Sequence, residues 1–412
     1  MALPMGLTRR RLEACLALDD FERMARRTLP RPIFGYVAGA AEDNHSLVDN
    51  RDAYRELALL PENPRDVSGR SQSATLFGKT YATPFGIAPM GIAAMSAYRG
   101  DLVLARAARK AGILNIMSAS SLIRLEDVAA EAPDTWFQAY LPGDDARIEA
   151  LLARVARAGF ETLVVTVDIP VMGNRENNIR AGFSTPLKPS LRLAFDGLVR
   201  PRWLIGTLAR TLLRHGMPHF ENSFAERGAP IISSRVLRDF AKRDHFDWAH
   251  IGRIRRQWKG PFVVKGLLNP ADARRARELG VDGIVVSNHG GRQLDGAIAP
   301  LRVLAEMADA AGPMVVMVDS GIRRGSDVLK ALALGAKFVL VGRPFNFAAA
   351  VAGEAGVTRA ISILKEEVDR NMAMLGVSRC ENIRTDHVRL RQGNFGMLDA
   401  QSAAVGRQRQ TV

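Results

Sequence analysis

The segment 283–295 (GIVVSNHGGRQLD) joins an apolar β-branched run to a histidine, two glycines and an arginine. Runs of this type form buried strands, so His289 is expected at a strand end with Arg292 three residues later. An imidazole can move a proton near neutral pH, and a guanidinium can hold a carboxylate through two parallel hydrogen bonds. The pair predicts proton transfer on a carboxylic acid. For the segment alone, a core histidine beside a surface arginine is the alternative.

Eight short apolar runs recur along the chain, and segments of helical period separate them. The runs are 84–89, 113–118, 135–141, 162–168, 261–267, 283–289, 314–320 and 338–343. The helical candidates are 100–112, 144–159, 270–280, 300–312 and 325–335. Several of them end at a glycine, as helices commonly do. Buried strands that alternate with helices over about 250 residues predict a (β/α)8 TIM barrel of the α/β class. A doubly wound sheet competes, but no early strand precedes a G-x-G-x-x-G motif.

The barrel prediction places the active site at the C-terminal ends of the strands. Polar residues gather at those ends: Gln138, Tyr140, Thr166, Asp168, Lys265, His289, Asp319 and Arg343. Each alone could be a capping or solvated loop residue, but a barrel built only for stability would not collect them on one rim. The loops after the last two strands form the usual phosphate site of this fold, with backbone N–H groups, a helix N-terminus and arginines. The sequence therefore predicts a phosphorylated ligand beside proton-transfer groups.

The length of 412 residues fits one large domain with additions. We expect a single domain over 1–390 with a basic helical extension at its N-terminus, a long insertion at 169–260 after the fourth strand, and a flexible tail at 391–412. A hydrophobic content of 47% and a charged content of 24% are globular values. Two cysteines indicate a reducing compartment rather than a disulfide framework, and no metal site is expected.

The net charge of +14 suits nucleic acid, an anionic membrane surface or anionic small molecules. Aromatic residues are only 6% and no nucleic-acid module is present, so nucleic-acid binding is not expected. Segment 187–220 has six basic residues and Asp196 as its only acid, with the apolar residues Trp203, Leu204, Ile205, Leu208, Leu212 and Leu213 at helical spacing. This pattern is typical of a helix in a membrane interface. A substrate lid packed on the barrel is the alternative.

Segment 287–295 (SNHGGRQLD) resembles the active-site signature of the FMN-dependent 2-hydroxy-acid dehydrogenases and oxidases, which include glycolate oxidase, L-lactate dehydrogenase and mandelate dehydrogenase. The resemblance extends over residues 10–390. It implies that FMN accepts a hydride at N5 from an (S)-2-hydroxy acid of the lactate or mandelate type. It also implies that the enzyme is a tetramer and that it passes electrons to a membrane quinone. The expected location is the cytoplasm, at the inner face of the cell membrane. A peroxide-forming oxidase is the alternative, and a flavin-dependent isomerase is a more distant one.

The same resemblance implies roles for individual residues. His289 would be the base, oriented by Asp168, and Tyr140 would contact the substrate hydroxyl. The substrate carboxylate would be held by Tyr36, Arg175 and Arg292. The FMN contacts would come from Pro89, Met90, Gly91, Ser118, Gln138, Thr166, Lys265, Ser287, Asp319, Gly321, Arg323, Gly342 and Arg343. Of these, Lys265 would lie beside N1, where its charge favours the reduced flavin.

Three residues depart from the family pattern. Met90 and Gly91 stand where many members have Thr-Ala or Thr-Gly, and Gly91 resembles the dehydrogenases more than the oxidases. Ser120 replaces a bulky aromatic residue, so a substrate larger than glycolate would fit. The sequence leaves two routes open: His289 removes the hydroxyl proton during hydride transfer, or it removes the α-proton to give a carbanion.

Overall fold

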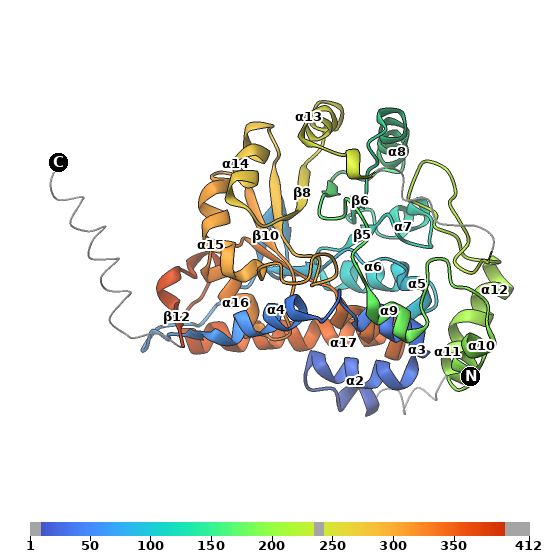
Figure 1. The fold of residues 1–412 in the computed structure, drawn as a ribbon. Helices are drawn as coiled ribbons and strands as arrows, with labels where there is room; N and C mark the ends of the chain where they lie inside the picture. Colours follow the sequence, from blue (N-terminus) through green and yellow to red (C-terminus); the bar gives the residue numbers. More distant parts are fainter. Residues whose placement is uncertain (1–9, 235–242, 392–412) are drawn as a thin grey trace.

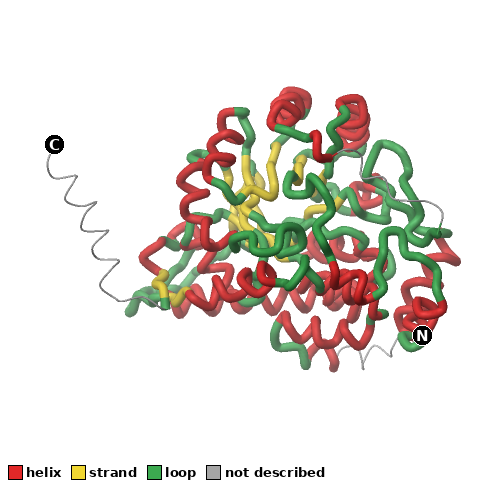
Figure 2. Tube along the Cα trace, viewed as in Figure 1, coloured by secondary structure: helices red, strands yellow, loops and turns green. Residues whose placement is uncertain are grey.

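A barrel of eight parallel strands, surrounded by helices, forms the centre of the computed structural model, which describes residues 10–234 and 243–391 (Figures 1 and 2). The strands are β4 (Phe85–Ile87), β5 (Ile116–Ser118), β6 (Trp136–Ala139), β7 (Leu163–Thr166), β8 (Phe262–Leu267), β9 (Gly283–Val286), β10 (Val315–Val318) and β11 (Phe338–Val341). Their order is β4-β11-β10-β9-β8-β7-β6-β5, and a parallel bridge between Ile87 and Asn115 joins the two ends. The predicted (β/α)8 barrel is confirmed.

The barrel helices begin and end where local sequence signals lie. They are α6 (Gly100–Ala111), α7 (Leu125–Glu131), α8 (Asp145–Arg157), α13 (Trp248–Gln257), α14 (Pro270–Glu278), α15 (Pro300–Ala311), α16 (Gly325–Ala333) and α17 (Arg343–Leu375). The Asp144 carboxylate accepts from the Arg147 N–H at 3.0 Å and so caps α8. Gly112 ends α6 at a φ of 65°, in the left-handed region that glycine adopts readily. The five predicted helices are confirmed.

Helix α17 is long and apolar enough to cross a membrane by length and composition alone. Its backbone leaves the helical region at Ala352 and Gly353, so it consists of two helices joined at a kink. It packs against α6, α16 and the N-terminal helix α2 (Leu18–Thr28). We therefore interpret α17 as a helix of the barrel wall.

Alternation along the strands decides which side chains enter the barrel interior. The lower interior is filled by Ile116, Trp136, Val164, Val263, Val285, Met317, Phe338 and Leu340. The hairpin of β2 (Ala74–Leu76) and β3 (Lys79–Tyr81) closes this end, with the Tyr81 ring 5.7 Å from the Phe338 ring. Two residues further along the strands, the same interior face carries Ser118, Gln138, Thr166, Lys265, Ser287 and Asp319. The strand pleat thus brings polar side chains from six strands into one layer at the C-terminal end.

The N-terminal extension folds along the barrel and reaches its active end. It contains α2, α3 (Arg31–Ala38) and α4 (His45–Glu56). Strand β1 (Leu57–Leu59) pairs antiparallel with β12 (Val388–Leu390), so segments from opposite ends of the chain lie side by side. The predicted tail at 391–412 lies outside the described residues, apart from Arg391.

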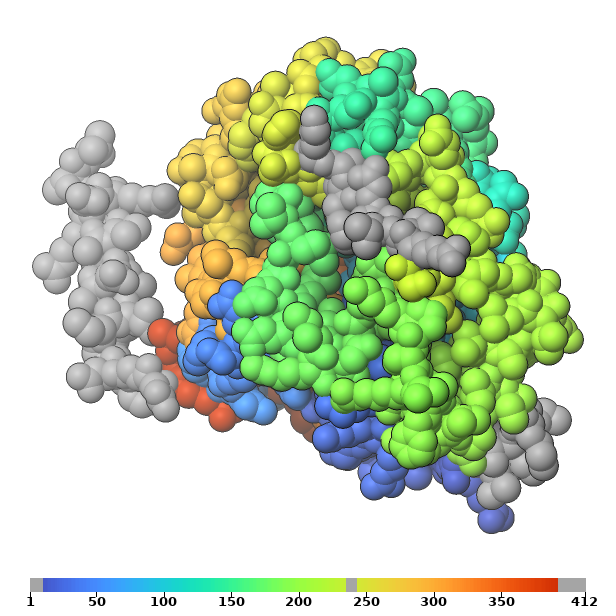
Figure 3. Space-filling model, turned by 45° about the vertical axis from the view of Figure 1, so that its right-hand side comes forward, coloured from blue at the N-terminus to red at the C-terminus, as the bar shows by residue number. Residues whose placement is uncertain are grey.

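The long insertion forms short helices beside the barrel, and in Figure 3 its green and yellow-green atoms cover much of the visible face. They are α9 (Glu176–Ala181), α10 (Leu191–Leu198), α11 (Pro201–Trp203), η1 (Leu204–Ala209), α12 (Arg210–His215) and η2 (Arg243–His245). The apolar residues predicted at helical spacing face two different surroundings, because Trp203 is buried and donates to the Met95 carbonyl at 2.6 Å. Leu204 and Leu208 also pack on the core, whereas Ile205 and Leu213 are exposed.

Candidate active site

A cavity that is open to solvent lies at the C-terminal ends of the barrel strands. Most of the predicted site residues line it: Tyr36, Pro89, Met90, Gly91, Tyr140, Arg175, Lys265, His289, Arg292, Asp319, Gly321, Arg323, Gly342 and Arg343. The other predicted residues do not line the cavity but belong to the same strand ends: Ser118, Gln138, Thr166, Asp168 and Ser287. The structure therefore brings the predicted set together around one cavity.

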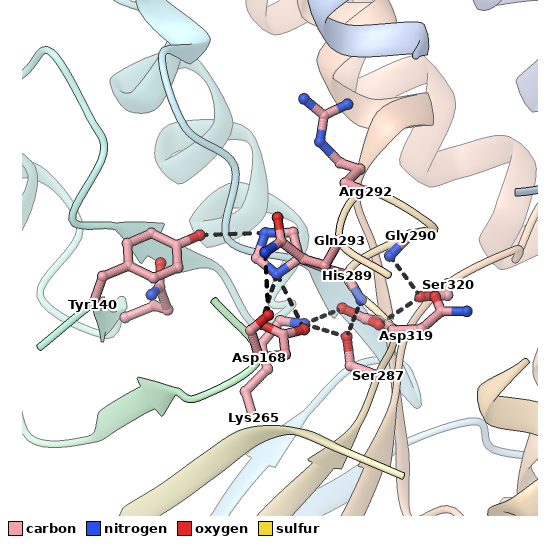
Figure 4. Close-up of polar contacts among 12 residues, drawn as sticks. Tyr140, Asp168, Lys265, Ser287, His289, Gly290, Arg292, Gln293, Asp319 and Ser320 are labelled. Carbon is pink, nitrogen blue, oxygen red and sulfur yellow. Dashed lines mark hydrogen bonds and ion pairs between the residues drawn. The ribbon is translucent and has the colours of Figure 1, made fainter. Parts of the chain in front are cut away.

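His289, which follows β9, and Asp168, which follows β7, form a hydrogen-bonded pair (Figure 4). His289 Nδ1 lies 2.9 Å from Asp168 Oδ1 and 3.2 Å from Oδ2. The other ring nitrogen, Nε2, lies 3.4 Å from the Tyr140 hydroxyl. The backbone of His289 has a φ of 57°, which is rare for a residue with a side chain and turns the chain sharply after β9.

Burial and charge set the protonation states of this pair. Burial lowers the pKa of His289 below its usual value, although the Asp168 carboxylate opposes that shift. Burial alone would raise the pKa of Asp168, but the charge and hydrogen bond of His289 lower it overall. An ionised Asp168 favours the tautomer with hydrogen on Nδ1, so the Nε2 lone pair of a neutral His289 can accept a proton.

Lys265 belongs to a buried polar network at the ends of β8, β9 and β10. Its Nζ donates to Ser287 Oγ at 2.5 Å and to Asp319 Oδ2 at 2.6 Å. Ser320 donates to Asp319 Oδ1 at 2.8 Å and accepts from the Gly290 N–H at 3.0 Å (Figure 4). A buried ammonium is tolerated because these groups satisfy it. The network fixes a positive charge in the cavity wall.

Arg292 and Arg343 concentrate positive charge around the Gly39 carbonyl in the cavity wall. Arg292 donates from NH1 to the Gly39 carbonyl at 2.6 Å, and Arg343 donates from NH2 to the same oxygen at 2.9 Å. Burial lowers the pKa of Arg292 to about 10, and Arg175 adds to this shift. Burial also lowers the pKa of Arg343 well below its usual value, with Arg292 as a further cause. Two buried cations this close suit anionic ligands.

Arg292 keeps one nitrogen for a ligand. Within the described chain, Arg292 NH2 is buried and has no hydrogen-bond partner. Its guanidinium lies 4.8 Å from the centre of the Tyr36 ring, which steadies it by a cation–π contact. Arg175 has less freedom, because its Nε donates to the Arg292 carbonyl and its NH2 to Gln293 Oε1, at 3.0 and 2.5 Å.

The loops after β10 and β11 form the predicted phosphate corner, with Gly321, Arg323, Gly342 and Arg343. The helix N-terminus that is free for an anion there differs from the expectation in one respect. The Asp327 carboxylate accepts from the N–H groups of Arg323 and Arg324, and Glu367 accepts from that of Gly325 at 2.7 Å. The N-terminus of α16 is therefore capped by protein carboxylates. Helix α17 begins at Arg343 with no side-chain cap, so its N-terminus is the better donor for an anion.

Two buried polar atoms beneath the cavity test whether a flavin fits. Within the described chain, Gln138 Nε2 and Thr166 Oγ1 are buried without a hydrogen-bond partner, while Ser118 Oγ donates to Gln138 Oε1 at 2.9 Å. Buried polar groups normally find partners. The carbonyl and nitrogen atoms of a flavin ring would provide them, and the buried arginines suit its phosphate. The residues present therefore fit FMN.

Several residues around the site had not been assigned from the sequence. Ser320 lines the cavity, and its backbone has a φ of 77°. Gln293 Nε2 donates to the Asp168 carbonyl at 3.2 Å. The other newly found lining residues include Ile169, Met172, Arg243 and Asn346. Gln293 lies inside the signature and Ser320 follows Asp319, so both could have been found. Arg243 and Asn346 carried no comparable signal.

The comparisons with known proteins agree with this architecture. Residues 25–390 match the family described as FMN-dependent dehydrogenase. The chain is 36% identical to (S)-mandelate dehydrogenase of Pseudomonas putida, over 90% of this chain and 93% of that protein. It is 40% identical to L-lactate dehydrogenase of Caulobacter vibrioides, over 87% of this chain and 93% of that protein.

Two solved structures give the same result. One is a monotopic membrane protein, (S)-mandelate dehydrogenase, with a TM-score of 0.84, 35% identity, and coverage of 92% of this chain and all of that chain. The other is mandelate oxidase with benzoyl-formic acid, with a TM-score of 0.76, 36% identity, and coverage of 92% and 99%. The family match extends over most of the described residues, and the site residues suit its cofactor. The chain therefore belongs to the FMN-dependent dehydrogenases.

Proposed function

We propose that this enzyme oxidises an (S)-2-hydroxy acid of the lactate or mandelate type to the 2-oxo acid. The observation that carries the proposal is the arrangement of His289 and Arg292 on one cavity. His289 offers a neutral nitrogen beside Asp168, and Arg292 offers a buried nitrogen without a partner in the described chain. A base and a carboxylate clamp are the two groups that a hydroxy-acid substrate requires.

The substrate carboxylate would bind Arg292, with Tyr36 and Arg175 beside it in the cavity wall. The substrate hydroxyl would then lie near His289 Nε2 and the Tyr140 hydroxyl, which are 3.4 Å apart. Burial and the nearby Asp168 raise the pKa of Tyr140 to about 12, so this phenol stays protonated and can donate a hydrogen bond. The substrate would thus be held through its carboxylate and through its hydroxyl group, on two sides of the α-carbon that is oxidised.

When bound, FMN supplies the two-electron oxidant, with N5 as the acceptor of the hydride equivalent. His289 removes a proton, either from the hydroxyl group or from the α-carbon. Asp168 stabilises the resulting imidazolium in both routes. Lys265, held by Ser287 and Asp319, would favour negative charge on the reduced ring.

The substrate side chain would point toward Met90, Gly91, Ser120, Ile169 and Met172, which line the cavity. A Cβ added at Gly91 would lie 2.9 Å from Ser120 Cβ and 3.1 Å from the Tyr36 hydroxyl. The absence of that methyl group therefore leaves room at the cavity wall. This supports a side chain of lactate size or larger.

The electron acceptor is proposed to be a membrane quinone. The monotopic membrane (S)-mandelate dehydrogenase supports this assignment, whereas the similarity to mandelate oxidase favours oxygen as the alternative. In this chain, α10 to α12 expose large apolar side chains, among them Leu191 at 93%, Leu213 at 87% and Phe195 at 64%. Six basic residues lie between positions 188 and 214 of the same segment, so the surface suits an anionic bilayer interface. We propose peripheral binding at the cytoplasmic face of the membrane and a tetrameric enzyme.

The reaction is tested by mixing the FMN-loaded protein with L-lactate or L-mandelate without oxygen. Bleaching of the flavin absorption by one of them is expected, with one 2-oxo acid formed per flavin. A loaded protein that stays oxidised with a panel of 2-hydroxy acids would refute the proposal. Rapid peroxide formation in air would replace quinone by oxygen as the acceptor.

A further inference from the structure

Helix α2 of the N-terminal extension lies against α17, below the barrel in Figure 1, and reaches the predicted phosphate corner. Asp19, in its first turn, makes contacts with two arginines from other parts of the chain. Asp19 Oδ1 lies 3.2 Å from Arg323 Nε, and Asp19 Oδ2 accepts from Arg51 NH2 at 2.6 Å. Arg323 lines the cavity and is buried, so this carboxylate lies directly behind a predicted cofactor contact.

The contact with Arg323 is an ion pair rather than a well-aligned hydrogen bond. Asp19 Oδ1 is buried and has no hydrogen-bond partner within the described residues, although Arg323 Nε is close. Arg323 NH1 is held separately, because it donates to the Ile322 carbonyl at 2.9 Å. These two restraints fix the guanidinium plane and leave NH2 as the nitrogen that no described protein acceptor takes.

The charges around Arg323 are consistent with an orienting role for the Asp19 carboxylate. Burial lowers the pKa of Arg323, and Arg51 adds to the shift, while Glu22 and Asp19 on α2 oppose it. A carboxylate behind an arginine usually weakens binding of an anion in front of it. Here Arg51 neutralises Asp19, so the pair orients Arg323 without adding net negative charge.

We propose that Asp19 is a positioning residue for the FMN phosphate, acting through Arg323, and that α2 is therefore part of the cofactor site. The proposal rests on the assignment of Arg323 as a phosphate contact. It adds a residue from an element outside the barrel to a site otherwise formed by strand ends. The competing interpretation is an ion pair that only attaches α2 to the barrel.

Binding of FMN and riboflavin to the apoprotein separates these interpretations, because riboflavin has the same ring and no phosphate. For Asp19→Asn, the FMN dissociation constant should rise about tenfold, as expected for loss of one charge-assisted contact. Riboflavin affinity should stay within about twofold, a change of less than ~0.5 kcal/mol. Fluorescence quenching on titration of each flavin measures both constants without any substrate, so the result does not depend on the proposed reaction.

Asp52→Asn is the matched control. Asp52 makes an exposed ion pair with Arg55 on α4, and the substitution removes the same charge as Asp19→Asn. It should leave both affinities unchanged. Unchanged FMN affinity in Asp19→Asn would overturn the proposal, and tighter FMN binding would show that repulsion dominates, which also overturns it. An equal loss for both flavins, with a lower melting temperature of the apoprotein, would assign Asp19 a structural role alone.

Discussion

Arg292 and Arg343 donate to one carbonyl oxygen, that of Gly39, at 2.6 and 2.9 Å. One arginine is proposed to hold the substrate carboxylate, and the other the cofactor phosphate. Gly39 follows α3, where its N–H donates to the Gly35 carbonyl at 2.9 Å. A single backbone group thus positions the arginines of two adjacent anion sites.

Gly39→Ala should weaken both sites together. The added Cβ would lie 2.7 Å from the Gly35 oxygen and 2.9 Å from Asn177 Cβ, so the carbonyl must move. We expect KM for the hydroxy acid and the FMN dissociation constant each to rise about tenfold, or ~1.4 kcal/mol. Gly206→Ala is the control, because a Cβ there meets nothing within 4 Å. A change in only one of the two constants would refute the shared role.

Arg292→Lys should remove most of the activity and leave the flavin bound. An ammonium cannot donate both to the Gly39 carbonyl and to a carboxylate in the fork geometry of a guanidinium. A loss of ~3 kcal/mol in transition-state stabilisation, more than about a hundredfold in kcat/KM, is expected. Steady-state kinetics with a charge-matched control, Arg275→Lys at an exposed pair on α14, measure it. Equal activity of the two variants would exclude Arg292 as the clamp.

The barrel and its rim were predictable because their signals are local. Each strand is a short apolar run, and the alternation that buries Val285 also directs Ser287 into the same interior two residues later. Proton transfer at His289 was predicted from its residue type and position, whereas the role of Lys265 came from a resemblance. Both residues line the cavity at the rim. Once the strands form a parallel barrel, their order alone determines how the residues at their C-terminal ends are placed around the rim.

Contacts between distant segments could not be predicted in this way. The shared Gly39 carbonyl, the pairing of β1 with β12 and the ion pair of Asp19 with Arg323 each join segments far apart in the chain. Trp203 illustrates the other limit, because helical spacing of apolar residues does not distinguish a face that meets a membrane from one that meets the core. Tertiary packing decides between them.

The pH dependence of kcat/KM should report the His289–Asp168 pair. A base must be neutral to act, so activity rises with pH through the pKa of His289, which burial holds below its usual value of about 6.5. Asp168 opposes that lowering, so Asp168→Asn should move the acid limb to lower pH. It should also reduce the plateau by roughly a hundredfold, because the imidazolium loses its counterion. An acid limb that moves to higher pH in this variant would contradict the assignment.

Membrane binding should depend on the exposed apolar residues of the insertion. Replacing Leu191, Phe195 and Leu213 by glutamate should abolish co-sedimentation with anionic liposomes and leave FMN bound, because these side chains are exposed. The control places three glutamates at Leu16, Val48 and Met374, which are exposed elsewhere. The basic residues predict that binding weakens as salt increases. Equal release of the two variants, or binding insensitive to salt, would contradict the proposed surface.

His289 is proposed to remove the proton when the hydroxy acid is oxidised. Its most direct test is the rate of flavin reduction in a single anaerobic turnover, measured by stopped-flow absorbance with His289→Ala and the unmodified enzyme, both loaded with FMN. We expect flavin reduction in the variant to be slower by about a thousandfold, with FMN affinity retained. A variant that reduces its flavin within about tenfold of the unmodified rate would contradict the claim, since general-base catalysis contributes more than that.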